Sequence, residues 1–368
     1  MYLMRMAVAV SMAVLAVFAC SQGARDAGAR GGPPVPSPPG ASAFVPSGPP
    51  MALGLSKFVG SVSSPTQDVN MAAYFNQVTP ENGGKWGVAE ATRDVMDWTG
   101  LDAAYALAKD NRLKAPGDPR DGTPYPLPFR LHTLVYGKQQ PGWVESLPPD
   151  RQRVEIERWF AAVAARYPAI DFIDVVNEPL HNPPVGSGHG NYIAALGGSG
   201  ASGWDWVIAA FEMGRRFFPA ARLGVNEYNV TNDAGLARDY RALVDLLRAR
   251  RLVDYVGVQG HAFETTVSSA TTLANLDLLA GAGLPVYITE FDIDGATDEA
   301  QLADYQRIFP LFWEHPAVRG ITLWGYRPGL WRQAQGAYIV LDNGAERPAM
   351  VWLQGYVRAR PASTLALP

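Results

Sequence analysis

The sequence predicts an α/β fold, a (β/α)₈ or TIM barrel, on the basis of two observations. Short apolar segments recur along the chain, and amphipathic helical segments fill the intervals between them. Polar residues collect at the carboxyl end of these apolar segments, which is where such barrels place their functional sites. About eight strand–helix alternations over roughly 300 residues are typical of this fold.

Each expected strand is a short apolar run that leads into polar or glycine-containing sequence. The runs are KFVGSV (57–62), YFNQVTP (74–80), FRLHTLVY (129–136), FIDVVNEP (172–179), RLGVNEYN (222–229), YVGVQGHA (255–262), PVYITEFD (285–292) and GITLWGYR (320–327). Residues 150–167 and 233–251 are expected to be helices, because apolar residues recur there at helical spacing. No G-x-G-x-x-G turn and no G-x-x-x-x-G-K-[ST] occurs, which argues against a doubly wound nucleotide-binding sheet.

Composition narrows the class of protein. Of 368 residues, 48% are hydrophobic and 18% are charged, as in an ordinary globular protein. The net charge of −4 gives no basic surface for nucleic acid. The 10 Trp, 15 Tyr and 14 Phe suit a core and also suit sugar binding, in which flat rings stack on sugar faces. A single cysteine excludes a disulfide framework within the chain.

The first 20 residues predict export. A basic start precedes an apolar run, which is typical of a signal peptide over residues 1–19. The sequence VFAC resembles a bacterial lipobox, so Cys20 is expected to be the lipidated first residue of the mature protein at the cell envelope. The alternative is cleavage after Ala19, which would give a periplasmic or secreted protein.

Residues 21–50 are rich in Pro, Gly and Ser and predict a semi-extended tether. One domain is expected over residues 51–360. The lipid anchor is the only membrane contact that we expect, and the protein is expected to be a monomer.

Polar side chains occupy the carboxyl end of seven of the expected strands. In chain order they are Glu81, Asn82, Lys85; His132, Tyr136, Gln139; Asn177, Glu178; Asn226, Glu227, Tyr228, Asn229; Gln259, His261; Glu290, Asp292; and Trp324. Any one of them is explained by an ordinary solvated strand end. Solvation, however, would place polar groups at both ends of the strands. Because these residues all lie at the carboxyl end, the pattern favours a functional site.

The residue types in this set exclude two common kinds of active site. No H-E-x-x-H spacing suggests zinc, and no G-x-S-x-G turn suggests a serine hydrolase. Two glutamates remain, Glu178 and Glu290, at the tips of the fourth and seventh strands among amides, histidines and tryptophans. Two carboxyl groups that converge on one pocket can cleave a glycosidic bond if one holds a proton while the other stays ionised.

At this point the motifs resemble a known family, glycoside hydrolase family 10, the β-1,4-xylanases. DVVNEP resembles its acid/base motif and YITEFDI its nucleophile motif. TPENGGKW, LHTLVYGKQQPGW, VNEYN, GVQGHA and ITLWGYRPGLWR resemble further motifs in the same order, between about residues 57 and 350. The resemblance implies a (β/α)₈ barrel and a retaining endo-β-1,4-xylanase that acts on xylan or xylo-oligosaccharides without a metal or other cofactor.

The resemblance also implies roles for individual residues. Glu178 would be the general acid/base and Glu290 the nucleophile, with carboxyl groups about 5–5.5 Å apart. Asn177 would bind the sugar 2-hydroxyl, and His261 would orient Glu290. The other substrate-binding candidates are Lys85, His132 and Gln259 around the cleaved sugar, Glu81, Asn82 and Gln139 around the next sugar, Trp324 and Trp331 as stacking walls, and Tyr136 and Tyr228.

Three departures from the family pattern affect substrate preference. Tyr136-Gly137 stands where Trp-His is usual, Glu227 replaces a common Asp, and the spacing from Trp324 to Trp331 is one residue short. Branched xylan, short oligosaccharides or an aryl glycoside are therefore all open as preferred substrates, as is another β-glycoside. A rival of a different class is a lipid-tethered carbohydrate-binding protein without catalysis, against which both intact glutamates count.

Overall fold

The computed structural model describes residues 49–110, 126–185 and 191–360. The expected signal peptide, Cys20 and nearly all of the tether over 21–50 lie outside these residues, so they stay predictions. Packing begins close to the first described residues, because Met51 and Ala52 are buried and the Met51 amide donates to the carbonyl oxygen of Tyr74 (3.0 Å).

Eight strands form one parallel sheet. They are β1 (Phe58–Ser63), β2 (Val78–Pro80), β3 (Arg130–Tyr136), β4 (Phe172–Asn177), β5 (Arg222–Glu227), β6 (Tyr255–Val258), β7 (Val286–Phe291) and β8 (Val318–Leu323). The order is β2-β1-β8-β7-β6-β5-β4-β3, and a parallel bridge between Val78 and Phe129 connects the two ends. The sheet is thus a nearly closed barrel, which confirms the predicted fold.

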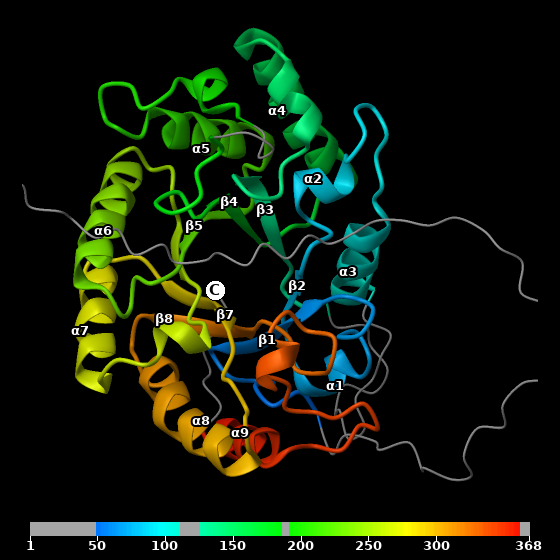
Figure 1. Ribbon diagram of the computed structural model, residues 1–368, viewed down its shortest axis with the longest axis vertical. Helices are drawn as coiled ribbons and strands as arrows, with labels where there is room; N and C mark the ends of the chain where they lie inside the picture. Colours follow the sequence, from blue (N-terminus) through cyan, green and yellow to red (C-terminus); the bar gives the residue numbers. More distant parts are fainter. Residues whose placement is uncertain (1–48, 111–125, 186–190, 361–368) are drawn as a thin grey trace, which may run out of the picture. The chain divides into compact units, whose positions relative to one another are not determined.

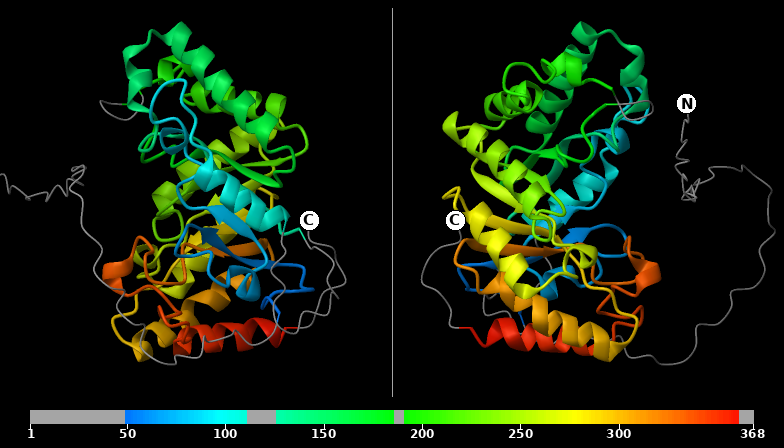
Figure 2. Two further views of the ribbon diagram at one scale, coloured as in Figure 1. Left: turned by 90° about the vertical axis from the view of Figure 1, so that its right-hand side faces the viewer. Right: turned by 60° about the vertical axis from the view of Figure 1, so that its left-hand side comes forward.

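Helices follow the strands and surround the sheet (Figure 1). They are α1 (Met71–Tyr74), α2 (Trp86–Ala89), α3 (Thr99–Lys109), α4 (Pro149–Arg166), α5 (Asp205–Phe217), α6 (Ala234–Ala249), α7 (Ser269–Ala280), α8 (Asp298–Trp313) and α9 (Pro348–Arg358). Short 3₁₀ turns lie at Gly142–Ser146, Ile193–Leu196, Ala262–Glu264 and Gln333–Gln335. Helices α8 and α9 lie side by side (Figure 2). The ring of Phe309 in α8 packs against those of Trp352 and Tyr356 in α9.

Local sequence explains the helix bounds. Asp233 caps α6 by accepting hydrogen bonds from the amides of Gly235 and Leu236 (2.7 and 3.0 Å). Buried residues recur along one face of this helix, which matches the expected 233–251, and α4 matches the expected 150–167.

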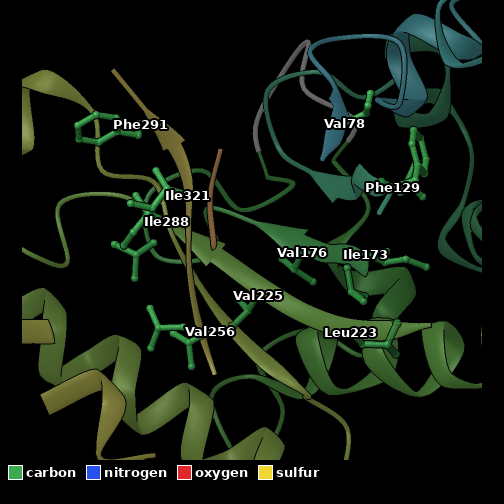
Figure 3. Close-up of a cluster of buried hydrophobic side chains, with 14 of the residues drawn as sticks. Val78, Phe129, Ile173, Val176, Leu223, Val225, Val256, Ile288, Phe291 and Ile321 are labelled. Atoms are coloured by element: carbon green, nitrogen blue, oxygen red, sulfur yellow. The ribbon is translucent and has the colours of Figure 1, made fainter. Parts of the chain in front are cut away.

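Buried apolar side chains of the strands form the core that joins the sheet to its helices (Figure 3). Leu223 and Val175, for example, lie close to Gly214 of α5, where an added Cβ would come within 3.2 and 3.4 Å of them. None of the helices in the described part of the chain combines the length and the apolar character that a membrane span requires.

An aromatic cluster fills the barrel interior near the amino ends of its strands. Phe58, Phe172, Tyr255 and Tyr287 are buried and contact one another. Phe58 stacks on Tyr287 with ring centroids 5.5 Å apart, and it also contacts Phe172, although β1 and β4 are not neighbours in the sheet. The contact therefore crosses the interior. This end of the barrel is closed by apolar packing, which leaves the carboxyl end for polar side chains.

Replacing Phe58 with Ala should lower the free energy of unfolding by about 3–5 kcal/mol, because it leaves a cavity in this cluster. Chemical denaturation followed by tryptophan fluorescence measures the change. Val351→Ala is the control, since Val351 is 57% exposed on α9 and should change stability by no more than about 0.5 kcal/mol. Equal stability of the two variants would contradict the packing role.

Candidate active site

A cleft of about 410 Å³ opens at the carboxyl end of the barrel strands. All of the catalytic and substrate-binding candidates expected from the sequence line it, together with three others. Four further strand-end residues of the sequence analysis, Asn226, Glu227, Asn229 and Asp292, do not line it. The lining residues are Glu81, Asn82, Lys85, His132, Tyr136, Lys138, Gln139, Asn177, Glu178, Asn182, Tyr228, Gln259, His261, Phe263, Glu290, Trp324 and Trp331. Parallel pairing brings them together, since the carboxyl ends of all eight strands meet at one rim.

The three additions are Lys138, Asn182 and Phe263. No motif in the sequence identifies them. Each follows an expected strand end by a few residues, and this position in the sequence is the only signal that could have identified them. Which of the loop residues turn back toward the cleft depends on the loop path, and single-sequence patterns do not specify that path.

Glu290, the last polar residue of β7, is buried and ionised. Its Oε1 accepts a hydrogen bond from Nδ2 of Asn226 (2.7 Å), and its Oε2 lies 3.3 Å from Nε2 of His261. Burial alone would raise the pKa of this carboxyl group. The hydrogen bond from His261 and nearby positive charges, including that of Arg130, outweigh burial and lower the pKa of Glu290 to about 2.

His261 is the cationic partner of Glu290. Its Nδ1 donates to Oδ2 of Asp292 over 2.8 Å. Burial would lower the pKa of the imidazole, but the charge and hydrogen bond of Asp292, with those of Glu290, raise it to about 10. His261 thus lies as an imidazolium between two carboxylates.

Asp292 fixes the orientation of this imidazolium from behind. Its Oδ2 also accepts from Nε1 of Trp331 (2.9 Å), and its Oδ1 accepts from the amide of Ala262 (2.8 Å). The guanidinium of Arg332 lies 3.8 Å from Oδ1. The position of Glu290 is therefore linked through His261 and Asp292 to Trp331 at the rim of the cleft.

Glu178 has a different environment from Glu290. Its Oε1 accepts from Nε2 of Gln259 (2.9 Å) and from Nδ2 of Asn177 (3.2 Å), and its Oε2 accepts from Nδ2 of Asn182. These donors are neutral amides rather than a cation. The hydroxyl of Tyr136 is a further neighbour, and burial together with the charges of Glu178 and Glu290 raises its pKa, which keeps it protonated.

Asn226 connects the two glutamates, although it does not line the cleft. Its Nδ2 donates to Oδ1 of Asn177 (2.8 Å) as well as to Glu290, and its Oδ1 accepts from the hydroxyl of Thr289 (2.5 Å). One buried amide thereby aligns residues from β4, β5 and β7.

Lys85 is buried beside the carboxylates, with Nζ 3.0 Å from Oδ1 of Asn82 and 5.8 Å from the ring centre of Tyr136. Burial lowers the pKa of Lys85, and the charges of the nearby glutamates, Glu290 first, oppose that shift. Asn82 Oδ1 also accepts from Nε2 of Gln139 (3.2 Å), and burial raises the pKa of the neighbouring Glu81. This side of the cleft is a hydrogen-bonding surface.

Aromatic and imidazole rings form the remaining walls. His132 hydrogen-bonds through Nδ1 to Oδ2 of the buried Asp174 (2.9 Å), and its ring meets the edge of Trp324 at 5.1 Å between centroids. Trp331 is 49% exposed and Phe263 is 38% exposed, so both offer apolar ring surface at the rim. Such rings suit the apolar face of a sugar.

Glu227, one of the departures noted in the sequence, lies outside the cleft. Its carboxylate is fully buried and accepts from the amide of Leu180 (2.9 Å) and from the amide of Tyr228 (2.9 Å). It also pairs with Nδ1 of His181 (2.8 Å). Burial raises the pKa of Glu227, and these donors oppose the shift. This residue holds the loop that follows β4.

Replacing Asp292 with Asn should lower the pKa of His261, because the largest favourable charge is lost while burial remains. In the unaltered protein the stabilisation from charged His261 is fully present below about pH 6.5 and is lost as pH rises through about 10. Histidine ¹⁵N NMR titration measures the pKa of His261 in the unaltered protein and in the variant. His181, which pairs with Glu227, should titrate unchanged in the variant. Titration of His261 near pH 6.5 in the unaltered protein would overturn this account.

The chain is similar in sequence to known proteins. Endo-1,4-beta-xylanase B of Cellvibrio japonicus is 35% identical over 302 residues, which are 81% of this chain and 45% of that protein. An anti-sigma-I factor of Acetivibrio thermocellus is 30% identical over 275 residues, 73% of this chain and 32% of that protein. The chain thus spans less than half the length of these relatives.

A solved structure supports the fold. The family 10 glycoside hydrolase of Paenibacillus barcinonensis superposes with a TM-score of 0.69 at 20% identity, over 84% of this chain and 98% of that one. The model of the family described as "Glycosyl hydrolase family 10" matches residues 52–356, which include every strand of the barrel and every residue that lines the cleft. The chain belongs to glycosyl hydrolase family 10.

Proposed function

We propose that the protein is a retaining endo-β-1,4-xylanase, in which Glu290 is the nucleophile and Glu178 the general acid/base. One observation carries the proposal: two glutamates line the same cleft in opposite environments. The imidazolium of His261 holds Glu290 ionised, whereas the side-chain amides of Gln259, Asn177 and Asn182 donate to Glu178. The xylanase named among the relatives supports xylan as the substrate class.

The reaction proceeds in two displacements. In the first, a carboxylate oxygen of Glu290 attacks the anomeric carbon, the glycosidic C–O bond breaks, and Glu178 gives its proton to the departing oxygen. In the second, the Glu178 carboxylate takes a proton from water, whose oxygen attacks the anomeric carbon and releases Glu290. The imidazolium of His261 favours the ionised form of Glu290 at the start and the end of this cycle.

Other lining residues would bind the sugar chain. Asn177, held by Asn226, is suited to the 2-hydroxyl of the cleaved sugar, a contact that strengthens as the transition state develops. Lys85, His132 and Gln259 surround the same sugar in this proposal. The residues proposed for the next sugar and for stacking are Glu81, Asn82, Gln139, Tyr136, Tyr228, Trp324 and Trp331.

The substrate is tested by a product profile on linear xylan, arabinoxylan and cellulose. We expect release of xylo-oligosaccharides from internal bonds of both xylans and little from cellulose. Two results would contradict the proposal. Cleavage of cellulose in preference to xylan would indicate another β-glycosidase, and xylan binding without any product would indicate a carbohydrate-binding protein.

The division of roles between the glutamates is tested by alanine variants and azide. Glu290→Ala should lower turnover of every substrate, by about 10⁴-fold or more, because no covalent intermediate forms. Glu178→Ala should largely spare glycosylation by an activated aryl glycoside, whose leaving group departs without a proton, and should abolish xylan hydrolysis.

Azide should rescue Glu178→Ala and yield a β-glycosyl azide, because the anion attacks the intermediate on Glu290 without a base. Formation of an α-glycosyl azide by Glu290→Ala instead would reverse the two roles. A crystal structure with the carboxyl groups about 9 Å apart, rather than about 5–5.5 Å, would refute retention.

A further inference from the structure

The loop after β4 begins with an unusual backbone at Glu178. This residue has φ 53°, in the left-handed region that a non-glycine residue seldom adopts. Two backbone hydrogen bonds secure it, since the amide of Glu178 donates to the carbonyl of Asn226 and the amide of Asn182 donates to the carbonyl of Glu178, both over 2.8 Å. The chain therefore turns back at once and brings Asn182 over the carboxyl group of Glu178.

Gly137, directly after β3, contacts this loop at Asn182 and Pro183. Its amide donates to the carbonyl oxygen of Asn182 over 3.0 Å. A Cβ added at Gly137 would lie 2.2 Å from that oxygen and 2.3 Å from the carbonyl oxygen of Pro183. Since any side chain at position 137 would displace the loop, the close approach requires glycine. With Glu227 holding Leu180 and His181, the loop is fixed from two sides.

In this position the side chain of Asn182 contacts Glu178. Its Nδ2 donates to Oε2 of Glu178, whereas the amides of Gln259 and Asn177 both donate to Oε1. The hydroxyl of Tyr228 also lies in hydrogen-bonding contact with the Asn182 side chain. The terminal torsion of a glutamate is broad by itself, and donors on both oxygens fix the plane of its carboxyl group.

We propose that Asn182 is a positioning residue for Glu178, and that Gly137 is the residue that allows it to take this place. The inference rests on the proposed role of Glu178 as the general acid. Asn182 orients the carboxyl group toward the departing oxygen and stabilises the negative charge that forms as the proton leaves. The amide thus contributes to the step that needs an acid and little to a step that does not.

The side chain and the backbone of Asn182 have separate roles in this geometry. Its amide and carbonyl close the loop whatever the side chain is, because they bond to Glu178 and Gly137 through main-chain atoms. Asn182→Ala therefore removes the contact with Glu178 and keeps the loop. Asn182→Asp keeps the shape as well, but it replaces a donor with a carboxylate that repels Glu178.

The test measures kcat/KM on a series of aryl β-xylobiosides of graded leaving group and on xylotetraose. Asn182→Ala should lose about 10- to 100-fold on xylotetraose, the range for a hydrogen bond to a charged group. It should lose less than about threefold on the dinitrophenyl glycoside, whose leaving group needs no acid. Asn182→Asp should lose at least as much as Ala. Thermal unfolding and circular dichroism confirm that the variants are folded.

Gly137→Ala tests the second half of the inference. The added methyl group should displace the loop and produce the same dependence on leaving group as Asn182→Ala. Combining the two substitutions should add little to either, because both remove one contact. Gly142→Ala is the matched control in the segment that follows β3, since an added Cβ there meets nothing within 4 Å.

Three outcomes would overturn the inference and leave the proposed function intact: an equal loss of kcat/KM across all leaving groups, wild-type activity of Asn182→Asp, or fully additive effects of the two substitutions. An equal loss would indicate a structural role for the loop. If the unaltered enzyme cleaved neither xylotetraose nor the aryl glycosides, the proposed function would fail, and this inference would fail with it.

Discussion

The cleft is organised around one buried negative charge, the carboxylate of Glu290. A charge inside a barrel is unfavourable unless it is paired and hydrogen-bonded, and each neighbour of Glu290 meets part of that requirement. His261 supplies the opposite charge and Asn226 supplies an amide donor. His261 is itself buried, so it needs Asp292, and Asp292 in turn accepts from Trp331 and from the amide of Ala262. A single ionised group thus determines a chain of contacts from the barrel interior to the rim.

Glu178 has a contrasting environment, and in the proposed function this contrast gives two identical side chains different roles. Its donors are the amides of Asn177, Gln259 and Asn182, which carry no net charge. The donors to Glu290, by contrast, include the imidazolium of His261. The left-handed backbone of Glu178 costs about 1 kcal/mol or more, and the backbone hydrogen bonds to Asn226 and Asn182 offset it.

The departures from the family pattern have structural reasons in this chain. Gly137 is required because the carbonyl oxygens of Asn182 and Pro183 occupy the space that a Cβ would take. Glu227 is no cleft residue; its carboxylate reaches the amide of Leu180 and the imidazole of His181. Both differences act on the loop after β4. Their contacts support the chain segment that begins at Glu178.

The sequence by itself determined the barrel and most of the cleft. Apolar strand runs, helical spacing and polar residues at the ends of seven strands are local patterns. Parallel pairing brings these strand ends to one rim, so Glu178, Glu290, His261 and their neighbours were predictable. Only the tertiary structure decided which groups meet across the barrel. The bonds from Asn226 to Asn177 and Glu290 join residues far apart in the chain, and the turn of Asn182 onto Glu178 depends on the space at Gly137. Sequence periodicity specifies the face of a strand or helix on which a side chain lies, but the partner of that side chain depends on distances that only the folded chain creates.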